Sequence, residues 1–141
     1  MKVSDVVLQA AVGLVLGAGV GAVVGFVTFA LGETLNPSGG FVILMPSGPL
    51  GVGILGAVMM GLVGVVIGLI VGALSLRVPS AAALGILIFL LSKARSIYYY
   101  FDRRQSLIGM ADLFVLLNLV IIAVLVALIL RKVFAGRGGY L

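Results

Sequence analysis

Side chains that could do chemistry are scarce in this chain, and they do not form a catalytic set. The sequence contains neither His nor Cys. Zinc, haem and iron–sulfur sites depend on imidazole or thiolate ligands, and His is the commonest general base. Ser92 directly precedes Lys93, but neighbouring residues of a helix point about 100° apart and would not meet. We therefore expect no enzyme activity, no catalytic residue, no metal and no cofactor.

Three polar residues near or within apolar runs are candidates for a polar site. Glu33 follows the first long apolar run, where it is either a solvated loop carboxylate or a cation or proton site at a pore mouth. Asp112 opens the last apolar run, where a carboxylate stabilises the helix dipole or pairs with Arg103 or Arg104. Asn118 lies within that run and is expected to form a hydrogen bond between helices.

Lys93 and Arg95 are the charges that lie deepest in an apolar region. Long basic side chains can extend from the membrane to the headgroups, and this is the simpler interpretation. Charged residues within a membrane are also functional candidates, here by binding an anionic headgroup or by pairing with Asp102 or a partner's acid. With Arg103 and Arg104, they are the candidate contacts for lipid headgroups or a partner subunit.

The overall composition indicates an integral membrane protein of the all-α class. Of the 141 residues, 63% are hydrophobic and 9% are charged, against about 45–50% and about 25% in soluble domains. A small soluble fold cannot hide so much apolar surface, and a chain within lipid must satisfy its backbone polar groups internally, as helices do. The net charge of +5 comes from basic residues near the ends of apolar runs. They are expected to anchor helices at headgroups, and nucleic acid is not an expected partner.

Four apolar runs predict four transmembrane helices in a single domain of residues 1–141, because about 20 residues span the hydrocarbon layer. The Pro- and Gly-rich stretch 32–49 is a predicted loop, and the Gly-rich tail 135–141 is expected to be mobile. The third run contains charges and is interpreted as one tilted helix, rather than a helix that ends near Ser92 before an aromatic surface segment. The helices are expected at about residues 5–31, 50–76, 80–101 and 109–134.

Small residues recur along the first two predicted helices at spacings of three or four, which places them on one face of each helix. Such faces permit close helix packing in membranes, where hydrophobic burial does not drive association. We expect a glycine-zipper hairpin within the chain; the alternative is that a stripe receives a helix from a second copy or another subunit. The expected helix-packing residues are Gly13, Gly17, Gly21, Gly25, Gly53, Ala57, Gly61, Gly64, Gly68 and Gly72.

Charge distribution gives an expected orientation. With four spans, the side that holds both termini and Arg77 carries five basic residues and the other side carries four. The bias favours N- and C-termini on the cytoplasmic side of a cytoplasmic-type inner membrane.

The expected function is a small non-catalytic structural or assembly subunit of a membrane complex or homo-oligomer. A small transporter, channel or lipid-translocating protein acting as an oligomer is the alternative, and a lipid-binding accessory is a third option. The first apolar run has no acid at its centre, which argues against a proton-coupled carrier. Expected partners are the bilayer, a second copy or other membrane subunits, and anionic lipid headgroups.

Overall fold

The described residues form four helices, in agreement with the predicted all-α class. The computed structural model describes residues 3–35, 48–103 and 110–135, with the side chains of 95–103, 110 and 111 left outside the description. The helices are α1 (Val3–Leu35), α2 (Pro49–Ala73), α3 (Val78–Arg103) and α4 (Met110–Phe134). The third run is one continuous helix through its charged segment, as predicted. The expected loop core, residues 36–47, and tail, residues 136–141, lie outside the described residues.

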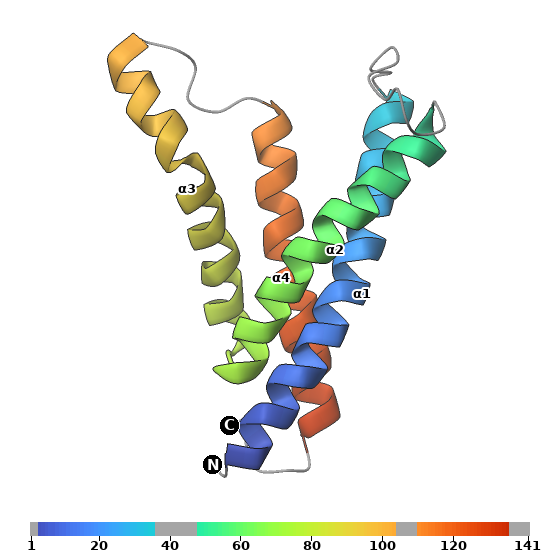
Figure 1. The fold of residues 1–141 in the computed structure, drawn as a ribbon, viewed down its shortest axis with the longest axis vertical. Coiled ribbons are helices and arrows are strands. Elements are labelled where there is room, and N and C mark those ends of the chain that lie inside the picture. The colour runs from blue at the N-terminus through green and yellow to red at the C-terminus, as the bar shows by residue number, and fades with distance from the viewer. Residues whose placement is uncertain (1–2, 36–47, 104–109, 136–141) are drawn as a thin grey trace.

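Successive helices run in opposite directions (Figure 1). The start of α1, the turn between α2 and α3, and the end of α4 lie at one end of the molecule. The end of α1 and the starts of α2 and α4 lie at the other end. We call the first of these the terminal end and the second the loop end.

Within the described ranges, three helices are long and apolar enough to cross a membrane, and this indicates a membrane protein. They are α1, α2 and residues Asp112–Phe134 of α4. The apolar part of α3 is shorter and covers Val78–Ala94. A fourth crossing is therefore still a prediction.

Helix α1 is longer than expected, because it continues past residue 31 to Leu35. The Thr34 hydroxyl donates a hydrogen bond of 2.8 Å to the Ala30 carbonyl, a local bond within the helix. Glu33 consequently lies in the last turn of α1 and not in a loop. It is half-buried at this position.

Helix α2 is shorter than expected and ends at Ala73 in a Schellman motif. The Leu76 N–H donates to the Val71 carbonyl at 3.1 Å, and the Ser75 N–H donates to the Gly72 carbonyl at 3.2 Å. Ser75 takes the left-handed conformation, with φ of 48°, at a position where glycine is usual.

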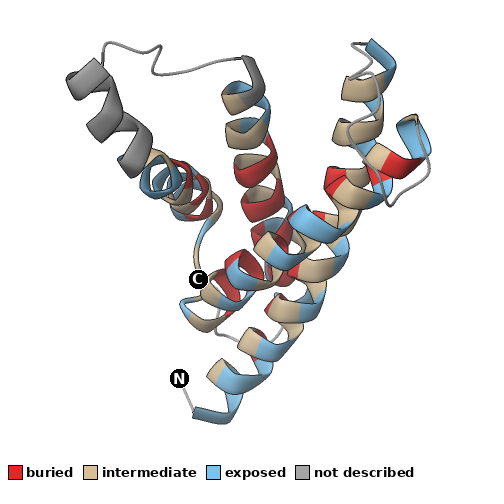
Figure 2. Ribbon diagram, turned by 45° about the horizontal axis from the view of Figure 1, so that its top comes forward, coloured by how far each residue is buried: buried red, intermediate tan, exposed pale blue. Residues whose placement is uncertain are grey.

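Helix α4 forms the centre of the fold and contacts each of the other three helices. Buried residues run along it (Figure 2), including Ile122, Val126 and Leu130, each 0% exposed. From Met110 to Phe134 it contains no glycine. It fills the centre, because its branched side chains occupy the space beside the closely packed α1–α2 pair.

Candidate functional site

The glycine face of α1 packs against the glycine face of α2. Gly13, Gly17, Gly21 and Gly25 are the buried glycines of α1. A Cβ atom at Gly17 would collide with the Gly64 carbonyl oxygen, and one at Gly64 would collide with the Gly17 carbonyl oxygen. Gly13 and Gly68 block each other in the same reciprocal way. The backbones are therefore in direct contact, at a separation that no side chain permits.

The α2 stripe differs in its first half from the expected one. Gly53, Gly64, Gly68 and Gly72 are buried as expected, but Gly56 and Met60 occupy the buried line in place of Ala57 and Gly61. A Cβ at Gly61 would meet only ordinary contacts, 3.6 Å from the Ala18 carbonyl oxygen and from Ala22 Cβ. The three-residue step of the stripe therefore lies between residues 53 and 56. The spacing of small residues along α2 was compatible with a three-residue step either between 53 and 56 or between 61 and 64.

A polar contact also joins α1 to the end of α2. Gln9 is 2% exposed, and its Oε1 accepts a 2.5 Å hydrogen bond from the Ser75 hydroxyl. The two residues are 66 positions apart in the chain. Gln9 and Ser75 are polar residues within the first two apolar runs, and no contact was predicted for either from the sequence. Their spacing along the chain did not indicate that they would meet.

Substitutions at Ser75 should separate the stabilising effect of its hydrogen bond to Gln9 from the cost of its left-handed backbone conformation. We expect Ser75→Ala to lower the free energy of unfolding by about 1–2 kcal/mol, because it leaves the buried Gln9 oxygen without its donor. Ser75→Gly loses the same bond but relieves a left-handed strain of about 1 kcal/mol. Unfolding of the two variants by SDS in mixed micelles, followed by circular dichroism, should rank Gly above Ala. Equal stabilities would contradict this account of Ser75.

Helices α3 and α4 approach each other closely at Gly85. A Cβ at Gly85 would lie 2.9 Å from the Leu119 carbonyl oxygen. Ala81, Gly85 and Phe89 are buried at intervals of four residues, so they share the face that meets α4. Lys93 is the next residue at that spacing.

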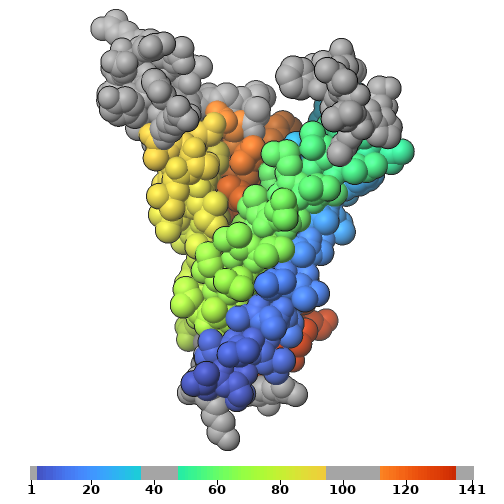
Figure 3. All heavy atoms as spheres, in the orientation of Figure 1, coloured from blue at the N-terminus to red at the C-terminus, as the bar shows by residue number. Residues whose placement is uncertain are grey.

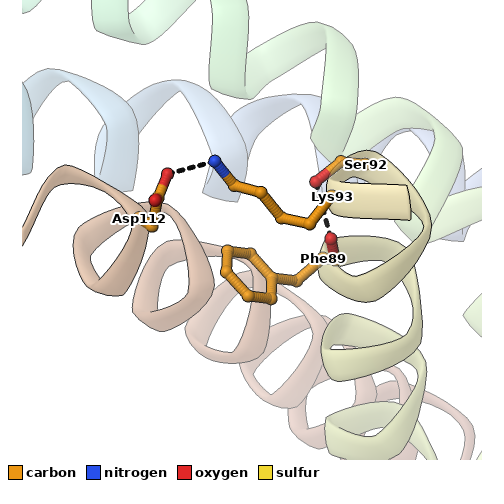
Figure 4. A network of polar contacts seen from close by, with 4 residues as sticks. All are labelled: Phe89, Ser92, Lys93 and Asp112. Carbon is orange, nitrogen blue, oxygen red and sulfur yellow. Dashed lines mark hydrogen bonds and ion pairs between the residues drawn. The ribbon is translucent and has the colours of Figure 1, made fainter. Parts of the chain in front are cut away.

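Lys93 forms an ion pair with Asp112 across α3 and α4 (Figure 4). The lysine side chain extends past the Phe89 ring toward Asp112 in the first turn of α4. The Ser92 hydroxyl instead donates a 2.7 Å bond to the Phe89 carbonyl of its own helix. The ion pairs considered as alternatives to snorkelling and helix capping were Lys93 with Asp102 or a partner's acid, and Asp112 with Arg103 or Arg104. Lys93 lies four residues after Phe89, on the face of α3 that meets α4, and this position brings it to Asp112.

The remaining basic candidates fall outside the description. Arg104 lies outside the described residues, and so do the side chains of Arg95, Asp102 and Arg103. Their expected contacts with headgroups or a partner therefore stay predictions.

A cleft between α1, α2 and α4 brings Glu33 and Asn118 together. Its volume is about 270 Å³, and Thr28, Phe29 and Phe114 also line it. Asn118 is 1% exposed, and its Oδ1 has no hydrogen-bond partner within the described part of the chain. The predicted bond between helices is thus not made at this oxygen. Asp112, the third polar candidate, pairs with Lys93 instead.

Over the described ranges, no cluster of three or more His, Cys, Asp or Glu residues could hold a metal ion. The Lys93–Asp112 pair fixes two helices, and the cleft offers oxygen acceptors between apolar walls.

No protein-family model, curated protein or solved structure matches this chain.

Proposed function

We propose that this chain is a small non-catalytic membrane subunit that assembles with the helices of another membrane protein. The main support is a groove between α2 and α3. Among the described residues, α3 has no contact with α1 and only a slight one with α2. Figure 3 shows atoms of α4, in orange, between those of α3 and α2. A helix from a partner would pack there against three helices at once.

The two helices beside the groove carry exposed apolar side chains. Leu87, Leu90 and Leu91 of α3 are 50% or more exposed, and Leu62 of α2 is 68% exposed. Helix association within a membrane depends on packing rather than on removal of apolar surface from water. We therefore expect a partner that fits the groove by shape.

In this proposal, α1 and α2 form a glycine-zipper hairpin that serves as the rigid scaffold of the subunit. Gly13, Gly17, Gly64 and Gly68 already meet one another within the chain. A partner helix would have to separate the hairpin to use either stripe. The assembly surface proposed here is therefore α3 with the adjoining groove, and not the glycine stripes.

We further propose that α3 also crosses the membrane, as a tilted helix, with both termini in the cytoplasm. Arg77 follows α2 at the terminal end, and Arg131 and Lys132 lie in the last turn of α4 at that same end. Basic residues are retained on the cytoplasmic side of membrane proteins. The membrane is then of the cytoplasmic, inner type.

Purification of the tagged native protein in a mild detergent tests the assembly role. We expect other membrane proteins to remain bound in a fixed ratio by mass spectrometry. Photo-crosslinking amino acids at the exposed α3 positions 86, 87, 90 and 91 should link to the same protein. Matched positions on α1, at Val15 and Val23, are also exposed and should give no such link.

Two results would count against this proposal. Crosslinks to lipid alone at every α3 position would remove the groove as an assembly surface. A homogeneous homo-oligomer with nothing else attached would replace a hetero-complex by self-assembly, and would lead directly to flux assays.

The cleft supports a second candidate function, that of a small transporter, channel or lipid-translocating protein acting as an oligomer. It places Glu33 and the buried Asn118 at the loop end of α1, α2 and α4. Flux of cations or of a labelled lipid in proteoliposomes, with Glu33→Gln as the comparison, tests this function. A flux that Glu33→Gln abolishes would favour transport over assembly.

A further inference from the structure

We propose that the ion pair between Lys93 and Asp112 is a strap that holds α3 at a fixed angle to α4 and thereby sets the width of the groove between α2 and α3. The use of that groove as an assembly surface rests on the proposed function, whereas the strap itself does not. Three observations carry the inference: the attachment of α3 to the molecule, the sizes of the side chains along that attachment, and the position of the pair.

Helix α3 is attached to the described part of the molecule mainly along one side. It contacts α4, touches α2 only slightly and has no contact with α1. Residues 74–77 connect its start to the end of α2. Toward the loop end, α3 and α4 diverge (Figure 1). The angle between these two helices, and with it the opening of the groove, therefore depends on the side chains that lie between them.

These side chains increase in size in the direction in which α3 and α4 diverge. At Gly85 the helices are in close contact, since an added Cβ would lie 2.9 Å from the Leu119 carbonyl oxygen. Phe89, one turn further toward the loop end, is 4% exposed, so its ring fills the space that opens there. Lys93, another turn further, reaches across to Asp112 with its long stem. The Phe89 ring thus prevents α3 from closing onto α4, and Gly85 is the pivot about which α3 can turn.

The ion pair supplies the force that prevents α3 from opening away from α4. Apolar contacts resist this movement weakly, because an apolar side chain that leaves the protein within a membrane is covered by lipid instead of water. Opposite charges attract strongly where the dielectric constant is low, and the two side chains of the pair are only 25% and 21% exposed. The Ser92 hydroxyl donates to the Phe89 carbonyl of its own helix, so its proton takes no part in this restraint.

The position of the pair gives it control over the angle. Lys93 lies eight residues beyond Gly85 on α3, and Asp112 lies seven residues from Leu119 on α4. With a rise of about 1.5 Å per residue, both charges are about 10–12 Å from the pivot and lie at one level. The apolar part of α3 covers Val78–Ala94, and that of α4 begins at Asp112. The strap therefore joins the two helices where their apolar parts end.

Double electron–electron resonance on the full chain in phosphatidylcholine nanodiscs tests the strap without a partner. The chain contains no Cys, so Leu62→Cys on α2 and Leu91→Cys on α3 can carry nitroxide labels at exposed sites beside the groove. We expect a narrow distance distribution in the parent and a broader one, with a mean about 3 Å longer, in Lys93→Met and in Asp112→Asn. This shift corresponds to a turn of about 20° about Gly85, because Leu91 lies about 9 Å beyond the pivot along the helix.

Controls separate the strap from a general loosening of the fold. Lys93→Arg keeps the charge and should keep the narrow distribution. Labels at Ile86→Cys, beside the pivot, and at Val133→Cys, an exposed site on α4, should keep their distance in every variant. Lys93→Met and Asp112→Asn break the pair from opposite helices, so either one suffices if circular dichroism shows that the other does not fold. An unchanged distribution across the groove would overturn the proposal, as would an equal broadening between the two control labels.

The link between the strap and assembly is measured separately. Crosslinking from position 87 to the captured membrane protein should decrease in Lys93→Met and not in Lys93→Arg, because a groove of altered width no longer fits the same helix. Equal crosslinking in Lys93→Met and the parent would overturn the role of the strap in setting the groove. A purification that captures no partner would contradict the proposed function, and the resonance distances would still decide the strap.

Discussion

Gly17→Ala should lower the free energy of unfolding by about 1–3 kcal/mol or more, whereas Gly19→Ala should not lower it. A methyl group at Gly17 would meet the Gly64 carbonyl oxygen and lie 2.9 Å from the Gly68 Cα atom. These are backbone atoms of a packed helix, so they cannot move aside as a flexible side chain would. The two helices must separate along their length, and reciprocal contacts at neighbouring glycines are lost with them.

Gly19 is the matched control, since it lies in the same helix with nothing within 4 Å of an added Cβ. Alanine there gains up to about 1 kcal/mol in helix propensity. Gly61→Ala is a second control on α2, where an added Cβ finds ordinary contacts at 3.6 Å. Unfolding by SDS, followed by circular dichroism, measures all three. Similar stabilities for Gly17→Ala and Gly19→Ala would contradict the described α1–α2 contact.

A disulfide between positions 22 and 61 would show whether the glycine faces meet within one chain. An added Cβ at Gly61 lies 3.6 Å from Ala22 Cβ, which suits a disulfide bond. The chain contains no Cys, so Ala22→Cys with Gly61→Cys forms the bond against no background. We expect oxidation to give a crosslinked monomer on a denaturing gel. A crosslinked dimer would mean that the stripe receives a second copy.

Breaking the Lys93–Asp112 pair should produce the second large effect. We expect Lys93→Met or Asp112→Asn to lower the free energy of unfolding by about 1–3 kcal/mol. This lies between the small value of surface pairs and the large one of buried pairs, because the two side chains are 25% and 21% exposed. Each substitution removes the ion pair between two partly buried side chains.

A double-mutant cycle isolates the contact itself. The double variant should be more stable than the sum of the single losses predicts, with a coupling of about 1 kcal/mol or more. Lys132→Met is the control, because Lys132 is an exposed basic residue in the last turn of α4, and it should change stability little. A coupling near zero would indicate that Lys93 acts through the headgroups and not through Asp112.

The sequence by itself determined the membrane class and the helical fold, whereas the absence of catalytic chemistry stays a prediction. Composition and the lengths of the apolar runs carry that information, since a helix satisfies its own backbone wherever it lies in lipid. Spacing also identified which face of α1 is free of side chains. In the same way, the four-residue interval from Ala81 to Lys93 could have indicated that Lys93 faces a helix.

The tertiary structure alone decided which faces meet and at what register. Spacing along one helix does not determine how far a second helix slides along it, so Gly56 and Met60 could not be distinguished from Ala57 and Gly61. The contact between Gln9 and Ser75, 66 residues apart, depends on that register and on the turn that ends α2. The cleft of Glu33 and Asn118 depends on a third helix as well, because its walls come from segments that only the packing of α4 against α1 and α2 brings together.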